Sequence, residues 1–311
     1  MFRKKDIPPA YSLIEQRKRT IIVKNDWKEK LLTVGIAGPD FFVKQSLLKE
    51  ENYFGRGALK VIAIPGEANE RIVIRHFQRG GMIRKLIPDL YCGASRPLQE
   101  LWVGYRAREK GVPFADIVAA CHTKIFGKLH RGDLATREIK DGKDLAAYLA
   151  DLGQPLTREK VLEKRKVIKV AGELVRVMHE AGIFHGDLNL KNIILQTTSS
   201  QNIKGFLIDF DKSFIRSPLK GKQRIRNLLR LNRSAEKFKK QGLPLTRTDA
   251  IRFLLSYLQN PPDFKPRLKV LNRQYKKHRR LHRWGEHFRS LFKKEHLFAY
   301  PFLRQFFIDF S

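Results

Sequence analysis

Two carboxylates and one amide in this chain have a spacing that suits phosphoryl transfer. Residues 185–192 read HGDLNLKN, so that Asn192 follows Asp187 by five positions, and Asp209 comes seventeen residues after Asn192. Phosphoryl transfer needs metal ions on the phosphates, a group that positions the acceptor hydroxyl, and a cradle for the triphosphate. Asp187 can accept or orient the hydroxyl proton. Asn192 and Asp209 offer the oxygen ligands that Mg²⁺ prefers.

Short apolar segments connect these residues. The segments 192–195 and 205–208 are separated by a polar stretch at 196–204, which predicts a β-hairpin. Asp187 and Asp209 then flank this hairpin, and both are expected to face one cavity.

Two neighbouring residues leave their roles more open. His185 is expected to support the loop by hydrogen bonding rather than to take part in the chemistry. Asp211 is a candidate second metal ligand, and equally a carboxylate that stabilises a turn or caps a helix.

The surrounding sequence predicts a small β-rich part followed by a mostly helical part, with a cleft near residue 140. Residues 61–64 and 71–74 are β-rich and flank a turn, which indicates a hairpin. The other expected elements are a helix over 97–110, two strands around Gly127 within 117–134, and helices over 145–152 and about 158–179, capped by Asp144 and Thr157.

The net charge of +32, from 63 Lys and Arg against 31 Asp and Glu, predicts an anionic partner. Nucleic acid, a membrane surface and a polyanionic substrate all meet this requirement. The two cysteines, Cys92 and Cys121, are far apart and suggest neither a disulfide framework nor a zinc site. No apolar stretch reaches the ~18 residues of a transmembrane helix, and the N-terminus lacks a signal-peptide pattern.

The motifs resemble those of a known family. Residues 185–192 followed by Asp209-Phe210-Asp211 look like the catalytic loop and metal-binding motif of kinase-fold enzymes, and Gly186 and Asn189 look more like those of small-molecule and sugar kinases. Residues 74–81, 208–213 and 226–234 are similar to the 3-deoxy-D-manno-octulosonic acid (Kdo) kinases and the wider lipopolysaccharide core kinases. The resemblance covers about residues 50 to 240.

This resemblance implies a fold, cofactors and further site residues. The fold is α+β and protein-kinase-like, with a β-rich N-terminal lobe over 1–140 and a larger helical lobe over 141–311. The cofactors are ATP and Mg²⁺. Gly55 and Gly57 fall where a glycine-rich loop covers the phosphates. Arg75 falls near the usual phosphate-binding Lys, and Glu100 is the partner expected for that cation.

The implied function is phosphorylation of a hydroxyl of Kdo on a lipid A precursor, during assembly of the lipopolysaccharide inner core. The implied location is cytoplasmic, on the cytoplasmic face of the inner membrane, and no nucleic acid partner is expected. A kinase of another sugar or small molecule, such as a core heptose or an aminoglycoside-like acceptor, would carry the same catalytic residues. A protein kinase is disfavoured because no Ala-Pro-Glu-like segment follows Asp211. A nucleic-acid-binding module with a vestigial cleft is disfavoured by the intact catalytic motifs.

A basic helix is expected beyond residue 213. Arg226, Arg230 and Arg233 lie at i, i+4 and i+7, so they share one helix face that presents forked donors to phosphate and carboxylate groups. This face is predicted to bind the anionic acceptor or the membrane surface and to take no part in the chemistry. The aromatic stretch 297–310 has no assigned role.

Overall fold

The computed structural model describes residues 7–38, 41–42, 59–67, 70–78, 89–198 and 202–260, with a few single positions between 262 and 273. The chain divides into two compact units, Met1–Pro261 and Pro262–Ser311. All elements named below lie in the first unit. Gly55, Gly57 and the aromatic stretch 297–310 lie outside the described residues.

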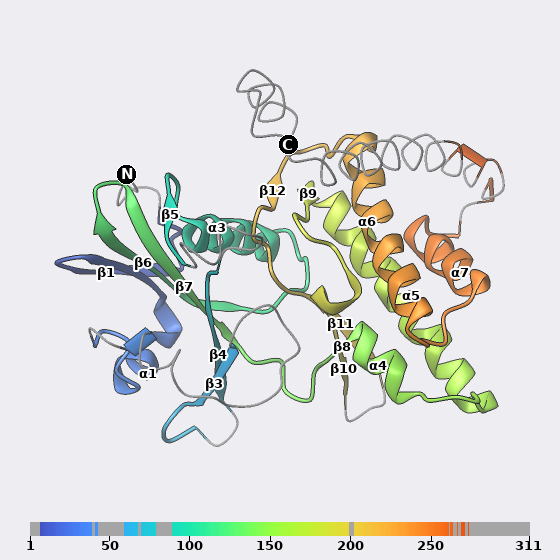
Figure 1. Cartoon of the computed structure of the whole chain (residues 1–311), viewed down its shortest axis with the longest axis horizontal. Coiled ribbons are helices and arrows are strands. Elements are labelled where there is room, and N and C mark those ends of the chain that lie inside the picture. Colours follow the sequence, from blue (N-terminus) through green and yellow to red (C-terminus); the bar gives the residue numbers. More distant parts are fainter. Residues whose placement is uncertain are drawn as a thin grey trace, which may run out of the picture. The chain divides into compact units, whose positions relative to one another are not determined.

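The N-terminal part is an antiparallel sheet in the order β1-β2-β6-β7-β4-β3, with β5 paired to β7 (Figure 1). A short helix, α1 (Lys28–Thr33), follows the second strand, and α3 (Arg96–Glu109) packs on the sheet beside β6. The strands are β1 (Tyr11–Gln16), β2 (Arg19–Lys24), β3 (Leu59–Ala63), β4 (Arg71–His76), β5 (Tyr91–Cys92), β6 (Ile117–Phe126) and β7 (Leu129–Arg137).

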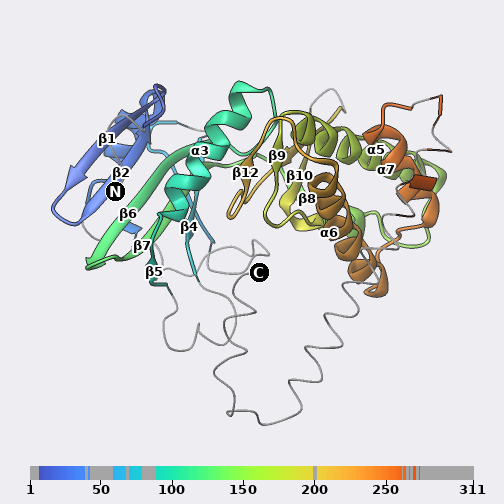
Figure 2. The same ribbon diagram turned by 90° about the horizontal axis from the view of Figure 1, so that it is seen from above.

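The C-terminal part consists of helices around two small sheets, β11-β10-β8 and β12-β9. Figure 2 shows α5, α6 and α7 grouped at one end of the molecule and the long sheet at the other. The elements are β8 (Lys143–Asp144), α4 (Leu145–Asp151), α5 (Arg158–Glu180), β9 (Ile183–Phe184), β10 (Ile193–Thr197), β11 (Ile203–Leu207), β12 (Phe214–Ile215), α6 (Gly221–Lys240) and α7 (Arg247–Tyr257).

Helix α5 is the centre of this second part. Its buried residues Val167, Ala171, Leu174 and Met178 recur at helical spacing and form one core with the strands and helices around them. Gly172 allows α7 to approach, because a Cβ at this position would lie 2.6 Å from the carbonyl oxygen of Phe253. The core therefore fixes the strands that carry the site residues.

Most of the predicted elements are confirmed. The β3–β4 hairpin, the helix α3, the two strands on either side of Gly127 and the hairpin β10–β11 all occur where the sequence indicated them. Asp144 and Thr157 cap α4 and α5 by accepting from the main-chain N–H of Ala147 and Lys160. The helix α1 lies in the part of the chain that was predicted to be β-rich, and the sequence did not indicate it. The domain boundary at 140/141 stays a prediction.

In the part of the chain that the structure describes, no helix combines the length and the apolar character needed to cross a bilayer.

Candidate active site

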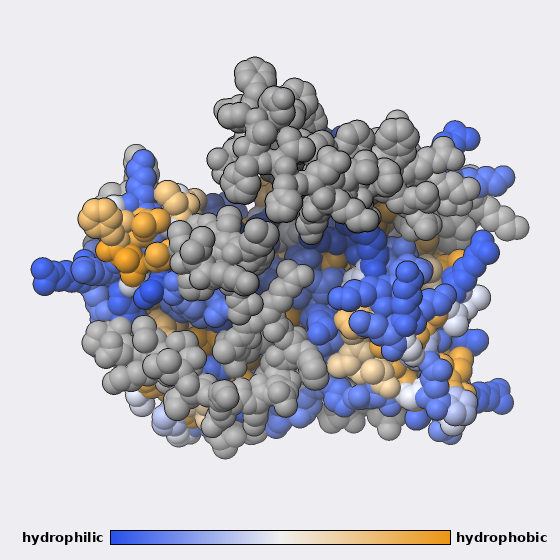
Figure 3. Space-filling model, in the orientation of Figure 1, coloured by the Kyte–Doolittle hydropathy of each residue, from blue (hydrophilic) through white to orange (hydrophobic). Residues whose placement is uncertain are grey.

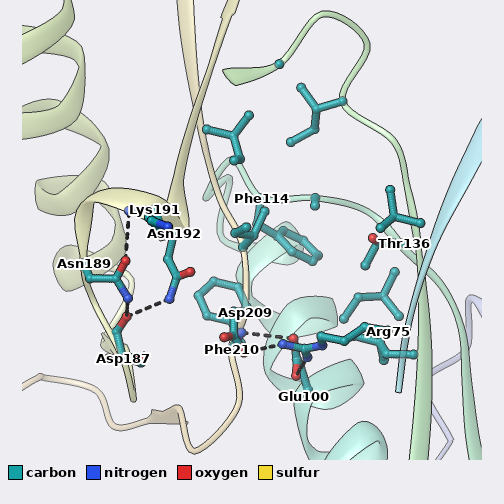
Figure 4. Close-up of a pocket in the computed structure, with 18 of the residues that line it drawn as sticks. Arg75, Glu100, Phe114, Thr136, Asp187, Asn189, Lys191, Asn192, Asp209 and Phe210 are labelled. Carbon is teal, nitrogen blue, oxygen red and sulfur yellow. Dashed lines mark hydrogen bonds and ion pairs between the residues drawn. The ribbon is translucent and has the colours of Figure 1, made fainter. Parts of the chain in front are cut away.

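The loop between β9 and β10 is folded around one main-chain oxygen. The carbonyl of Asp187 accepts hydrogen bonds from Nδ2 of Asn192 at 2.8 Å and from Nδ2 of Asn189 at 3.0 Å (Figure 4). Asn189 in turn accepts from the main-chain N–H of Lys191 at 2.9 Å. Because Asn192 uses its Nδ2 in this way, its amide oxygen points away from Asp187, to the side on which Asp209 lies.

His185 joins this loop to the end of β11. Its Nδ1 accepts from the main-chain N–H of Asp187 at 3.0 Å, and its Nε2 donates to the carbonyl of Ile208 at 3.0 Å. These two roles require a neutral ring with the proton on Nε2. Burial favours this form, because it lowers the pKa of His185. The structure therefore places His185 in the supporting role expected from the sequence.

Gly186 is required by a close approach of two loops. A Cβ at this position would lie 2.3 Å from the carbonyl oxygen of Asp211 and 2.8 Å from that of Lys212. The hydroxyl of Ser213 accepts the N–H of Gly186 at 2.9 Å. The glycine thus allows the segments that carry Asp187 and Asp209 to pack against each other.

Arg75, on β4 of the sheet, connects two carboxylates of the site, those of Glu100 and Asp209. Its Nη1 lies 2.5 Å from Oδ1 of Asp209, and its Nη2 pairs with Oε2 of Glu100 in α3 (Figure 4). The other oxygen of Glu100 accepts from the main-chain N–H of Phe210 at 3.0 Å. Helix α3 therefore holds both the cation and the backbone that follows Asp209.

The carboxylates of Glu100 and Asp209 share the guanidinium of Arg75. Burial raises the pKa of Glu100 to about 7, with Arg75 opposing the shift and the nearby Asp209 and Asp211 adding to it. Burial alone would also raise the pKa of Asp209, but the charge and hydrogen bond of Arg75 hold it below its usual range. Asp209 is therefore ionised at neutral pH.

A pair of amide hydrogen bonds that the sequence did not reveal holds the catalytic loop in place. Asn227 of α6 is fully buried, donates to the carbonyl of His185 at 2.7 Å and accepts from its N–H at 3.0 Å. The same Oδ1 accepts from Nε2 of His179 at 3.1 Å, and Nδ1 of His179 pairs with the hydroxyl of Tyr257 at 2.8 Å. The only signal in the sequence was the position of Asn227 within the segment 226–234.

The three arginines predicted to share one face of α6, Arg226, Arg230 and Arg233, do not behave as one docking face. Arg230 lies 3.0 Å from Oδ1 of Asp187 through its Nε and also donates to the carbonyl of Gly186. Arg233 lines the same cavity as Arg230, whereas Arg226 lies over the ring of Phe184, 5.7 Å from its centre. The helix α6 turns the side chain of Arg230 onto the catalytic loop, so Arg230 does not stay apart from that loop. The role of each of the three arginines stays a prediction.

A cavity of about 870 Å³ lies between the sheet and the catalytic loop. Its apolar wall includes Val73 and Leu134 from the sheet, Phe114, and Ile194 and Ile208 from the hairpin. Its basic wall consists of Lys191, Arg230, Arg233 and Lys237, and the side chains of Asp187, Asn192, Asp209 and Arg75 lie along the same cavity. The apolar wall suits the base of a nucleotide, and the charged side chains along the rest of the cavity suit its phosphates.

Asp209 and Asn192 fit a magnesium site. Mg²⁺ is usually held by one or two carboxylates together with substrate phosphates rather than by a full cage of protein ligands. No group of three or more His, Cys, Asp or Glu side chains that could hold a metal occurs among the described residues. Asp211 stays a candidate second ligand, because its contact with Arg96 at 3.3 Å is no closer than the contact of Asp209 with Arg75.

Comparison with known proteins decides the family. Residues 44–257, more than two thirds of the chain, match the lipopolysaccharide kinase (Kdo/WaaP) family. The chain belongs to this family. A 3-deoxy-D-manno-octulosonic acid kinase of Haemophilus influenzae is 33% identical over 209 residues, which cover 64% of this chain and 81% of that protein. One from Vibrio cholerae is 33% identical over 168 residues, which cover 53% of this chain and 65% of that protein.

A solved structure supports the same fold. The structure of WaaP in complex with acyl carrier protein aligns with a TM-score of 0.53 at 21% identity, over 83% of this chain and 98% of that one. The predicted α+β, protein-kinase-like fold class is therefore confirmed. Membership of the lipopolysaccharide kinase family also confirms the predicted phosphotransferase activity and its place in lipopolysaccharide core biosynthesis.

The Arg75–Glu100 pair gives a first test of the site in this lipopolysaccharide kinase. We expect Arg75→Met and Glu100→Gln each to lower the rate of transfer, and the double variant to lose less than the sum of the two effects. Residues in one network deviate from additivity by about 0.5–3 kcal/mol. A double-mutant cycle in the activation free energy measures this coupling. Strict additivity would show that the pair makes no joint contribution, and Lys60 on β3 would be the next cation to test.

Proposed function

We propose that this enzyme transfers the γ-phosphate of ATP to a hydroxyl of Kdo on a lipid A precursor. The observation that carries the proposal is one cavity with Asp187 and Asp209 along its floor and a basic wall on the side of α6. The relatives named as 3-deoxy-D-manno-octulosonic acid kinases support the choice of acceptor. Kdo carries a carboxylate and the lipid A precursor carries phosphates, so the acceptor is anionic.

Asp187 is the group that receives or orients the proton of the acceptor hydroxyl. Hydrogen bonds from Asn189 and Asn192 hold its main chain, and the ion pair with Arg230 holds its side chain. Both members of that ion pair are 43% exposed, so an incoming acceptor has access to the carboxylate. A general base in position contributes about 10²–10⁴ in rate.

Asp209 and Asn192 would hold Mg²⁺, and Arg75 would bind the phosphates beside it. Bound Mg²⁺ would neutralise charge that develops on the transferred phosphate group. Gly55 and Gly57 remain the proposed phosphate-covering loop. The apolar wall formed by Val73 and Leu134 would accept the adenine.

The basic wall would bind the acceptor, and Arg233 offers a test with a matched control. Arg233→Gln is expected to raise the KM for the lipid acceptor about tenfold, because hydrogen bonds to charged groups contribute about 1.5–3 kcal/mol. It should leave the affinity for nucleotide unchanged. Arg226→Gln removes the same charge from the same helix, but Arg226 lies over Phe184 and does not line the cavity. Steady-state kinetics measure the KM for the lipid acceptor in both variants, and only Arg233→Gln should raise it. Equal effects would mean that the general charge of α6, and not the cavity wall, attracts the acceptor.

The proposed location is the cytoplasmic face of the inner membrane, where the enzyme would be peripheral. The lipid acceptor resides in that membrane, and the net charge of +32 favours an anionic surface.

Parallel acceptors test the proposed function. Labelled ATP is supplied with Kdo-lipid A, with lipid A that lacks Kdo, with a generic protein and with an aminoglycoside. Transfer to Kdo-lipid A alone is the expected result. Transfer to lipid A without Kdo would move the acceptor to another sugar, and transfer to the protein or the aminoglycoside would contradict the proposal.

A further inference from the structure

The turn between β6 and β7 exposes two apolar side chains. Phe126 is 79% exposed and Ile125 is 38% exposed, although both belong to a strand of the main sheet. Neither residue is part of the hydrophobic clusters formed by the described residues. Lys124 and Lys128 stand on either side of them in the sequence. The end of the hairpin is thus an apolar tip between two cations.

A second hairpin turn lies beside it. The main-chain N–H of Lys124 donates to the carbonyl of Lys18 at 2.7 Å, and Arg19 pairs with Thr123 across β2 and β6. The β1–β2 turn therefore adds Arg17 and Lys18 to the same end of the sheet. Figure 3 shows hydrophobic atoms beside strongly hydrophilic ones at this end of the molecule.

The charge at this end is one-sided. The stretches 16–19 and 123–131 contain no acidic residue, and Glu15 is the first acid outside them on β1. Arg19 is buried and donates to the carbonyl of Gly38, and Arg131 pairs with Asp89. The cations of these stretches that remain to face outward are Arg17, Lys18, Lys124 and Lys128. An exposed aromatic ring among cations is the pattern of protein segments that lie in the interface of an anionic membrane.

We propose that these two turns, 16–19 and 123–128, form an anchor for an anionic lipid bilayer. Phe126 and Ile125 enter the boundary between head groups and acyl chains, and the four cations bind lipid phosphates. The inference rests on the proposed function, in which the acceptor is itself a lipid. A bilayer is favoured over a protein partner because the tip projects, and insertion into lipid needs no complementary pocket.

The anchor would hold the active site close to its lipid acceptor. Strand β7 begins at the turn with Leu129 and reaches the cavity wall at Leu134, a distance of about 17 Å at 3.3 Å per residue. In Figure 2 the β6–β7 turn and the C-terminal half of α6 lie at opposite ends of the view, and both extend toward its lower edge. The last turn of α6 carries Lys237, Lys239 and Lys240.

Vesicle binding tests the anchor with the full chain, without nucleotide or acceptor. Phe126→Ser is expected to lower partition onto vesicles of phosphatidylglycerol and phosphatidylethanolamine about tenfold. Lys124→Gln and Lys128→Gln should lower it about fivefold for each charge, and only on vesicles that contain phosphatidylglycerol. Leu162→Ser is the matched control, because Leu162 is 48% exposed on α5, away from the two turns. Normal binding by Phe126→Ser, or an equal loss with Leu162→Ser, would overturn the proposal.

Two further measurements separate this proposal from the proposed function. The fluorescence of Phe126→Trp should shift to shorter wavelength when vesicles are added, and an unchanged spectrum would contradict insertion. Phe126→Ser should keep wild-type turnover on a water-soluble acceptor that carries Kdo without acyl chains. If Phe126→Ser lost as much turnover on that soluble acceptor as on the lipid acceptor, Phe126 would have a structural role and the proposed anchor would be overturned. Vesicle binding itself does not depend on which sugar is phosphorylated.

Discussion

Replacement of Asp187 by Asn is expected to lower the turnover number for phosphate transfer by about 10²–10⁴. The variant keeps the size of the side chain but removes the carboxylate that receives the acceptor proton. The main-chain contacts to Asn189 and Asn192 involve the carbonyl oxygen of residue 187, so the loop keeps its shape. Nucleotide binding should therefore be unchanged.

The measurement is single-turnover transfer from labelled ATP, with nucleotide affinity and the thermal midpoint of unfolding measured alongside. Asp151→Asn is a suitable control, because Asp151 is an exposed carboxylate that pairs with Lys143 and does not line the cavity. A variant at Asp187 that retained more than half of the wild-type turnover would remove this residue from the chemistry.

Replacement of Asp209 by Asn is expected to weaken the binding of Mg-ATP on the order of 100-fold, because a charge-assisted contact contributes about 1.5–3 kcal/mol. Asp209 is held in the ionised form by Arg75 and is the strongest candidate for the magnesium ligand. Without this carboxylate, Arg75 keeps its pairing with Glu100. The cavity would then lose its metal ligand without collapse of the ion pair.

Calorimetric titration with ATP, in the presence and absence of Mg²⁺, measures this effect. The dependence of affinity on Mg²⁺ should disappear in Asp209→Asn. Asp211→Asn is the matched comparison, because Asp211 is also a carboxylate paired with an arginine, Arg96. If Asp209→Asn bound Mg-ATP with wild-type affinity, the metal site would lie elsewhere, and an equal loss in Asp211→Asn would make Asp211 a second ligand.

Local patterns explain what the sequence could predict. Asp144 and Thr157 cap helices through contacts three residues away, and the hairpins around Gly127 and around residues 196–204 depend on neighbouring turns. Asp187 and Asn192 likewise lie within one loop, so their spacing in the sequence is enough to pair them. Such features are set by residues close together in the chain, so sequence reasoning reaches them.

Contacts between distant segments explain what the sequence missed. Asn227 meets His185 across 42 residues and His179 across 48, and Arg230 meets Asp187 across 43. Helical periodicity places Arg226, Arg230 and Arg233 near one another, but it does not say which element that face meets. The packing of α6 against the catalytic loop decides this, and it makes Arg230 a neighbour of Asp187.

The most direct test of the proposed reaction is the position of the new phosphate. Kdo-lipid A is incubated with ATP, Mg²⁺ and the enzyme, and the product is fragmented in a mass spectrometer. We expect one added phosphate on the Kdo fragment with the wild-type enzyme and, in the same time, at least about 100-fold less of this product with Asp187→Asn. A phosphate on the glucosamine fragment, or no added phosphate with the wild-type enzyme, would contradict it.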